Sequence, residues 1–212
     1  MTNLHPPNCF VVVVSGVPGS GKSTLVSGVA EALGEAVTLH FDDYGGTSIY
    51  PEDFKAWLQS GADPNDWKTP QLVQDLRTLR GGVTVLHPRS GVSLEPKPII
   101  VVEEPFGRAR EEMDVNVDFS AHINLPLDLA LVRLLRRMLA EDAAKEEAKR
   151  LGCLDIVESL SEMFLDDGMR GLLLQSDVQA ARSANIILDG TQTPEDLKTE
   201  LIKTLKPLIA AL

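Results

Sequence analysis

The chain has 212 residues, of which 43% are hydrophobic and 24% are charged, and its formal net charge is −11 at pH 7. This length and composition are typical of one folded domain with a sizeable core, and they exclude general disorder. The acidic balance argues against a nucleic-acid partner or a membrane-surface partner, and the apolar runs are too short to span a membrane.

Strand-like and helix-like segments alternate along the chain. Short apolar runs predict five strands, at residues 10–14, 37–41, 99–103, 119–125 and 184–188. Amphipathic stretches between them predict helices at residues 22–33, 70–80, 127–150, 154–182 (with a break near Asp167) and 194–211. Residues 83–98 interrupt the alternation and are expected to form a small hairpin or flap. The alternation predicts an α/β fold in which helices cover both faces of a parallel sheet.

A glycine-rich loop follows the first predicted strand and leads into the first predicted helix. Its residues are Gly16, Val17, Pro18, Gly19, Ser20, Gly21, Lys22 and Ser23, and Thr24 continues into the helix. This G-x-x-x-x-G-K-[ST] pattern, called a P-loop or Walker A motif, lets backbone N–H groups surround phosphate oxygens. Lys22 is expected to reach the β- and γ-phosphates of ATP, and Ser23 to bind Mg²⁺. The chain is therefore predicted to bind a nucleoside triphosphate.

The second predicted strand ends in two acids, Asp42 and Asp43, which Tyr44 follows. In an open parallel sheet, ligands bind beyond the carboxyl ends of the strands, so both acids are expected at the active edge. There Asp42 is predicted to take a proton from an acceptor hydroxyl and to help hold Mg²⁺, while Asp43 and Tyr44 contact the substrate. The alternative is a polar turn or a helix N-cap, where Asp is also favoured.

The third predicted strand also ends in two acids, Glu103 and Glu104. A carboxylate at this place can hold Mg²⁺ and its waters. Glu103 is the preferred metal residue, and Glu104 is the alternative. Arg108 lies in the loop that follows, where it either binds a substrate anion or is solvated.

Three arginines lie close together in the predicted helix at residues 127–150. Arg133, Arg136 and Arg137 are spaced by three and four positions, so their side chains share one broad face. In an acidic chain such a cluster predicts a lid that closes on the phosphoryl group, with Arg133 and Arg137 in catalysis and Arg136 on the nucleotide. The alternative is a solvated face whose arginines pair with acids further along the helix.

Aromatic and histidine side chains give weaker signals. Trp67 lies in a turn-rich entry to the predicted helix at residues 70–80, where it either stacks on a ring of the substrate or pins the helix to the core. Tyr44 has the same two alternatives. His40 and His122 lie inside predicted strands and are expected to be core residues.

In this order, the motifs resemble those of the uridine kinase, phosphoribulokinase and nicotinamide riboside kinase group of P-loop kinases. The matching stretches are the loop at residues 16–24, residues 40–44, the helix entry at 63–67, the strand end at 102–105 and residues 128–137. The resemblance implies a three-layer α/β/α sandwich with the P-loop NTPase fold, a five-stranded parallel sheet and a lid that bears arginines. It also implies one kinase domain over residues 1–212, in which Asp42 activates the acceptor hydroxyl.

The motifs and the resemblance together predict an enzyme that transfers the γ-phosphoryl group of ATP, with Mg²⁺, to a hydroxyl of a small molecule. A nucleoside or nucleoside-like riboside is the first acceptor class; a sugar, a sugar acid or a pantothenate-like alcohol are alternatives. A non-catalytic ATP-binding regulator is a further alternative. A GTP-driven switch would need an Asn-Lys-x-Asp motif, which the chain lacks.

The cysteines and the first residues bear on the compartment. Residues 1–7 lack the basic and apolar regions of a secretory signal. Cys9 and Cys153 have no metal-ligand spacing and are expected to be free thiols in a reducing compartment, so a cytoplasmic location is predicted. The oligomeric state is left open, with a homodimer as one alternative, and residues 154–182 receive no functional interpretation.

Overall fold

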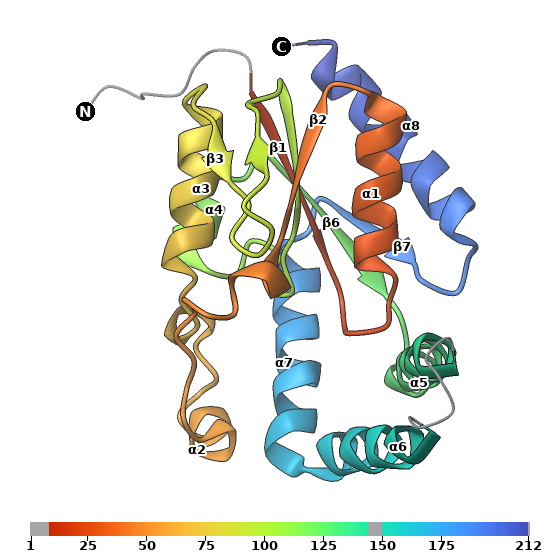
Figure 1. The fold of residues 1–212 in the computed structure, drawn as a ribbon. Coiled ribbons are helices and arrows are strands. Elements are labelled where there is room, and N and C mark those ends of the chain that lie inside the picture. Colours follow the sequence, from red (N-terminus) through yellow and green to blue (C-terminus); the bar gives the residue numbers. More distant parts are fainter. Residues whose placement is uncertain (1–8, 144–149, 212) are drawn as a thin grey trace.

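Five parallel strands form the central sheet of the computed structural model, which describes residues 9–143 and 150–211 (Figure 1). Their bounds are β1 Phe10–Ser15, β2 Ala36–His40, β5 Ile99–Glu103, β6 Phe119–Asn124 and β7 Ile186–Asp189. The strand order is β2-β5-β1-β6-β7, so β1 lies at the centre between β5 and β6. All five predicted strands are confirmed, with ends that differ by at most two residues.

The helices of the described residues largely follow the predicted pattern. Their bounds are α1 Lys22–Leu33, α2 Phe54–Gln59, α3 Pro70–Arg80, α4 Glu111–Asp114, α5 Leu127–Ala143, α6 Arg150–Leu165, α7 Asp167–Ser183 and α8 Pro194–Ile209. The predicted break divides α6 from α7, because the Asp166 side chain accepts a hydrogen bond from the Met169 N–H and caps α7. The sequence pattern does not predict α2 and α4, because helices of one or two turns are too short to show a helical period.

Helices cover both faces of the sheet. Successive residues of β1 point to opposite sides and are apolar, so both faces need to be covered. Val12 and Val14 are buried in an apolar cluster with side chains of α1 and α8. Val11 and Val13 are buried on the other side, in a cluster with side chains of α3. The expected three-layer α/β/α sandwich is confirmed.

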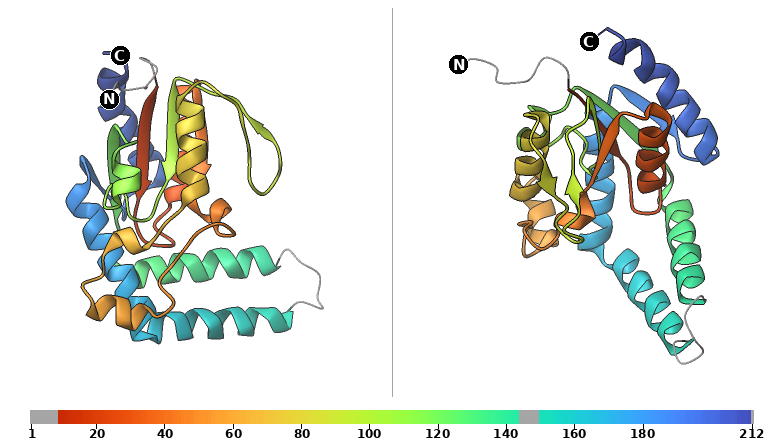
Figure 2. Two further views of the ribbon diagram at one scale, coloured as in Figure 1. Left: turned by 90° about the vertical axis from the view of Figure 1, so that its left-hand side faces the viewer. Right: turned by 45° about the horizontal axis from the view of Figure 1, so that its top comes forward.

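Two helices, α5 of the predicted lid and the following α6, extend beyond the sheet. α5 packs against α6, and the pair projects from the body of the protein (Figure 2). α5 covers the first part of the predicted lid at residues 127–150, and residues 144–149 lie outside the described residues. The arginines of the lid prediction all lie in α5, on the side of the molecule where β6 ends.

The predicted flap is a two-stranded hairpin. β3 (Val85–Leu86) pairs with β4 (Ser93–Leu94) in the antiparallel sense, and the hairpin stands apart from the central sheet (Figure 2). Val85 is buried in the same apolar cluster as α3, which attaches the base of the hairpin to the core. None of the helices in the described part of the chain has the length and apolar character needed to cross a bilayer.

Candidate active site

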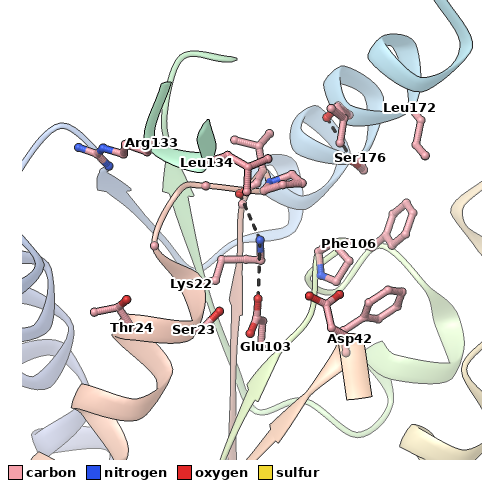
Figure 3. A pocket seen from close by; sticks show the side chains of 18 of the residues that line it. Lys22, Ser23, Thr24, Asp42, Glu103, Phe106, Arg133, Leu134, Leu172 and Ser176 are labelled. Atoms are coloured by element: carbon pink, nitrogen blue, oxygen red, sulfur yellow. Dashed lines mark hydrogen bonds and ion pairs between the residues drawn. The ribbon is translucent and has the colours of Figure 1, made fainter. Parts of the chain in front are cut away.

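A cleft of about 460 Å³ lies at the carboxyl ends of β1, β2 and β5 (Figure 3). The P-loop and the start of α1 form one side, with Lys22 and Ser23. Asp42 and Phe106 form the opposite side together with Leu172 of α7, and Glu103 lies between the two sides. The cleft therefore brings the P-loop, the second strand end and the third strand end together, as their place at one edge of a parallel sheet predicts.

The backbone of the P-loop requires glycine at several positions. Gly16, Gly19 and Gly21 have φ angles of 142°, 84° and 99°, a region that L side chains rarely adopt. A Cβ atom at Gly19 would also collide with the backbone carbonyl oxygen of Ala130 in α5. The loop thus packs directly against the backbone of the predicted lid helix.

Lys22 is held at the base of the cleft by two contacts. Its Nζ donates to the carbonyl oxygen of Val17 at 3.1 Å and lies 3.8 Å from Oε1 of Glu103 (Figure 3). Burial lowers the pKa of Lys22, and the negative charge of Glu103 opposes this change. The ammonium group is therefore little solvated in the structure, so a phosphate that replaces water there would meet a strong electrostatic attraction.

Of the two acids at the end of β5, Glu103 is the one that faces the cleft. Its Oε2 lies 2.9 Å from Nδ1 of His40. The expectation of a core histidine is therefore incomplete, because the His40 ring is only partly buried and contacts an acid that lines the cleft. Burial raises the pKa of Glu103, but the hydrogen bond from His40 and the charge of Lys22 outweigh burial, so the pKa lies below its usual value. The same contact with Glu103 raises the pKa of His40. Glu103 is thus an ionised carboxylate at neutral pH.

Glu104 points away from the cleft, because consecutive residues at a strand end face opposite sides. Its carboxylate is fully buried and lies 2.6 Å from Nη2 of Arg110, which is also fully buried. Arg110 further donates to the carbonyl oxygen of Trp67 and to Oγ1 of Thr69. This buried arginine therefore joins the loop after β5 to the segment that carries Trp67, and the sequence contains no pattern that indicates such a role.

We expect the replacement Glu104→Ala to destabilise the protein by about 3 kcal/mol, because it removes the fully buried one of the two carboxylates that pair with Arg110 and leaves only Glu112. The free energy of unfolding, measured by urea denaturation, tests this. The matched control is Glu52→Ala at an exposed position, which should change it by about 0.5 kcal/mol or less. A loss below about 1 kcal/mol for Glu104→Ala would contradict a structural role for the pair.

The acids after β2 lie in a 3-10 turn, Phe41–Tyr44, and they point in different directions. Asp42 lines the cleft, whereas the carboxylate of Asp43 contacts the flap through His87 and Arg89. Tyr44 is buried in the core, and its hydroxyl donates to Oδ2 of Asp75 at 3.0 Å. Of the three predicted residues, the structure places only Asp42 in the cleft.

The Trp67 ring both lines the cleft and packs in the core. It is 9% exposed, and its ring centroid lies 5.5 Å from that of Phe106. The rings of Tyr50 and Phe54 also contact it. The two alternatives for Trp67 are therefore compatible. Arg108 does not line the cleft; its Nε lies 2.6 Å from Oδ1 of Asp114.

The three arginines of α5 have different surroundings. Arg137 lines the cleft, whereas Arg136 is exposed and does not line it. Arg133 lies between the cleft and a smaller hollow behind the P-loop, and its Nη1 donates to the carbonyl oxygen of Gly190 at 2.8 Å. Its guanidinium lies apart from Lys22 (Figure 3).

Sequence reasoning missed several residues around the cleft. The hollow behind the P-loop, about 250 Å³ in volume, is lined by Gln192 and Pro194 from the segment after β7. The apolar wall of the cleft includes Phe41, Phe106 and residues of α7. The position after a parallel strand could have indicated Gln192. No local pattern could have indicated the α7 residues. The sequence pattern of a helix is the same whether its apolar face packs on a core or lines a cleft.

The parallel sheet, the P-loop at the end of its central strand and the acids that face it are the features of a P-loop kinase. Known proteins agree with this class. The chain is 29% identical to the uridine kinase of Cronobacter sakazakii, over 74% of this chain and 82% of that protein. It is 27% identical to the uridine kinase of Pasteurella multocida, over 66% and 73%. The resemblance to the uridine kinase group is thus confirmed, and with it the prediction of a small-molecule kinase.

Solved structures share the fold at low sequence identity. The shikimate kinase of Acinetobacter baumannii aligns with a TM-score of 0.53 at 14% identity, over 93% of each chain. The gluconokinase of Sinorhizobium meliloti aligns with a TM-score of 0.50 at 16% identity, over 97% of each chain. No protein-family model matches the chain.

Proposed function

We propose that the protein transfers the γ-phosphoryl group of ATP to a hydroxyl of a small, uncharged, nucleoside-like acceptor. The observation that carries this proposal is the placement of Asp42 in one cleft with Lys22 and Glu103 (Figure 3). Lys22 lies where a P-loop lysine meets the transferring phosphate, and Asp42 faces it from the acceptor side. In this proposal residues 1–212 form one kinase domain, with α5 in the lid and residues 83–98 as the flap.

ATP fits the P-loop side of the site. The N–H groups of residues 16–24 and Nζ of Lys22 would bind the phosphates, and Arg137 would reach them from α5. Arg133 and the hollow lined by Gln192 offer a place for the base. Arg136, which is exposed, would act only after movement of the lid.

Mg²⁺ also fits this side of the cleft. Among the described residues no group of three or more acidic, histidine or cysteine side chains forms a metal cage. This agrees with a Mg²⁺ that binds through phosphate oxygens and only one or two protein groups. Ser23 and the ionised Glu103 both line the cleft together with Lys22, so the two could serve the metal, with Asp42 nearby in the cleft. When bound, Mg²⁺ would neutralise charge on the β- and γ-phosphates.

The transfer itself follows from the groups on the two sides. The acceptor oxygen forms a bond to the γ-phosphorus, and the bond from that phosphorus to the β–γ bridging oxygen breaks, which releases ADP. Asp42 orients the acceptor hydroxyl and takes its proton. Lys22 and Arg137 stabilise the negative charge on the transferring group, and closure of α5 excludes water.

The lining of the acceptor side favours an uncharged acceptor with a flat ring. Trp67, Phe106 and Leu172 supply apolar and aromatic surface there. Among the described residues that line the cleft, the cationic ones are Lys22, Arg133 and Arg137, and all three lie on the P-loop side or in α5. Arg89, which contacts the backbone of Asp42, lines a separate hollow and not this cleft. Within the cleft a sugar acid would therefore meet cations only on the nucleotide side, whereas a nucleoside-like riboside would bury its ring against these aromatic side chains.

We expect ADP release with Mg²⁺ and ATP to increase when nucleosides or other ribosides are added, and to stay at the background rate with gluconate, shikimate or pantothenate. A coupled assay over this panel tests the proposal, and EDTA should abolish the stimulated rate because the phosphates then lack their counter-charge. Stimulation by the acids alone would contradict the acceptor class. ATP binding without stimulation by any hydroxyl compound would favour the regulator alternative.

A further inference from the structure

We propose that Asp43 is a positioning residue: it clasps the tip of the flap, and the clasp holds the turn that carries Asp42 in its catalytic orientation. This inference rests on the proposed function for its kinetic consequence but on geometry alone for the clasp. It replaces the interpretation of Asp43 as a substrate ligand. The clasp consists of Asp43, His87 and Arg89.

The clasp joins two segments that are far apart in the sequence. Oδ2 of Asp43 lies 3.2 Å from Nε2 of His87, and Oδ1 lies 3.3 Å from Nε of Arg89. Arg89 also donates from Nη2 to the backbone carbonyl oxygen of Asp42. One guanidinium therefore contacts the backbone of Asp42 and the side chain of Asp43, so displacement of the flap tip and rotation of the turn are coupled.

The geometry of the flap tip fixes the proton position on His87. Its Nδ1 accepts hydrogen bonds from the N–H groups of Arg89 and Ser90, at 3.2 and 3.3 Å. Nδ1 therefore carries no proton in this arrangement, and Nε2 carries the one that His87 donates to Asp43. The tip is thus folded around His87, and the Nε2–H of this residue faces the carboxylate of Asp43.

The rest of the flap does little to hold its tip. The flanking side chains Leu86 and Val92 are 63% and 60% exposed, and the base is attached through Val85. Asp43 is the better buried partner, with a side chain that is 18% exposed, against 64% for Arg89. The clasp is therefore the main attachment of the tip. Its Arg89 side chain is mostly exposed, and ion pairs to an exposed partner contribute little to global stability.

A clasp and a substrate ligand predict different kinetics. Loss of the clasp allows Asp42 to move away from its productive position, and displacements of about 1 Å can reduce the rate about 100-fold. The KM for ATP should be unchanged, because the P-loop is not part of the clasp. In contrast, loss of a direct ligand would raise the acceptor KM at constant kcat.

The test uses the full-length variants Arg89→Ala, Asp43→Asn and the double variant, in steady-state kinetics and in hydrogen–deuterium exchange. We expect kcat to fall about 10- to 100-fold in each variant, with the double variant no worse than the single ones, because all three break one unit. Exchange should increase in residues 41–47 and 87–91, and Tm should change little. Arg182→Ala, at an exposed position in α7, is the matched control and should match the wild type in all three measurements.

Three results would overturn the clasp. The first is unchanged exchange in both segments; the second is a raised acceptor KM at constant kcat; the third is a double variant with additive losses. If the wild type shows no turnover with any acceptor, the proposed function fails, but exchange still decides the clasp. Faster exchange in both single variants would then support the clasp without the kinase activity.

Discussion

The replacement Asp42→Asn should reduce kcat by about 10²–10⁴-fold, the contribution that a positioned general base makes, while ATP binding stays at the wild-type level. The asparagine amide keeps the size of the carboxylate but cannot take the proton of the acceptor hydroxyl. Asp42 lies on the side of the cleft opposite the P-loop, so contacts to the nucleotide should not change. Single-turnover kinetics with the best acceptor, together with ATP titration by calorimetry, measure the two effects separately.

The control for this variant is Asp155→Asn, which changes an exposed carboxylate of α6 in the same way. It should leave both kcat and ATP affinity unchanged. A wild-type kcat in Asp42→Asn would mean that another group takes the proton. Among the described residues, Glu103 is the other acid that lines the cleft, so Glu103→Gln would then be the next variant to measure.

The replacement Lys22→Met should reduce kcat by about 10²–10³-fold, because it removes a preorganised positive charge from the position of the transferring phosphate. Methionine retains the length and apolar stem of lysine, so the buried part of the side chain is still filled. Glu103 keeps its hydrogen bond to His40, which limits the effect on folding. The kcat for the best acceptor and the Tm are the measurements.

Lys203→Met is the matched control, because Lys203 is exposed on α8, away from the cleft. It should have wild-type kinetics and a similar Tm. If Lys22→Met lowers kcat and kcat/KM equally, the lysine acts in the transition state. If it raises only the KM for ATP, its role is binding of the ground state, which would contradict the proposed charge stabilisation.

Local patterns in the sequence were sufficient for the P-loop and for the sheet. The glycine positions follow from backbone angles that only glycine adopts readily, and this requirement is visible in one contiguous stretch. The strands follow from short apolar runs, since strands buried on both faces have little choice of residue. Their parallel arrangement then predicts that residues after β1, β2 and β5 meet at one edge.

The direction of each side chain at that edge depended on the tertiary structure. Two adjacent acids after β5 are equivalent in a local pattern, yet Glu103 faces Lys22 and Glu104 faces the buried Arg110. Likewise Asp42 lines the cleft, whereas Asp43 contacts a hairpin more than 40 residues away along the chain. Their partners come from distant segments, so no local pattern contains them.

The sequence by itself determined the fold class, the phosphate loop and the set of acids at the active edge, because these depend on the intrinsic preferences of short segments. Only the tertiary structure decided which acid faces Lys22, which one contacts the flap, and that aromatic side chains and α7 line the cleft. The physical reason is that burial and pairing of a charged side chain depend on which distant elements pack beside it. That choice is made by the packing of the whole core.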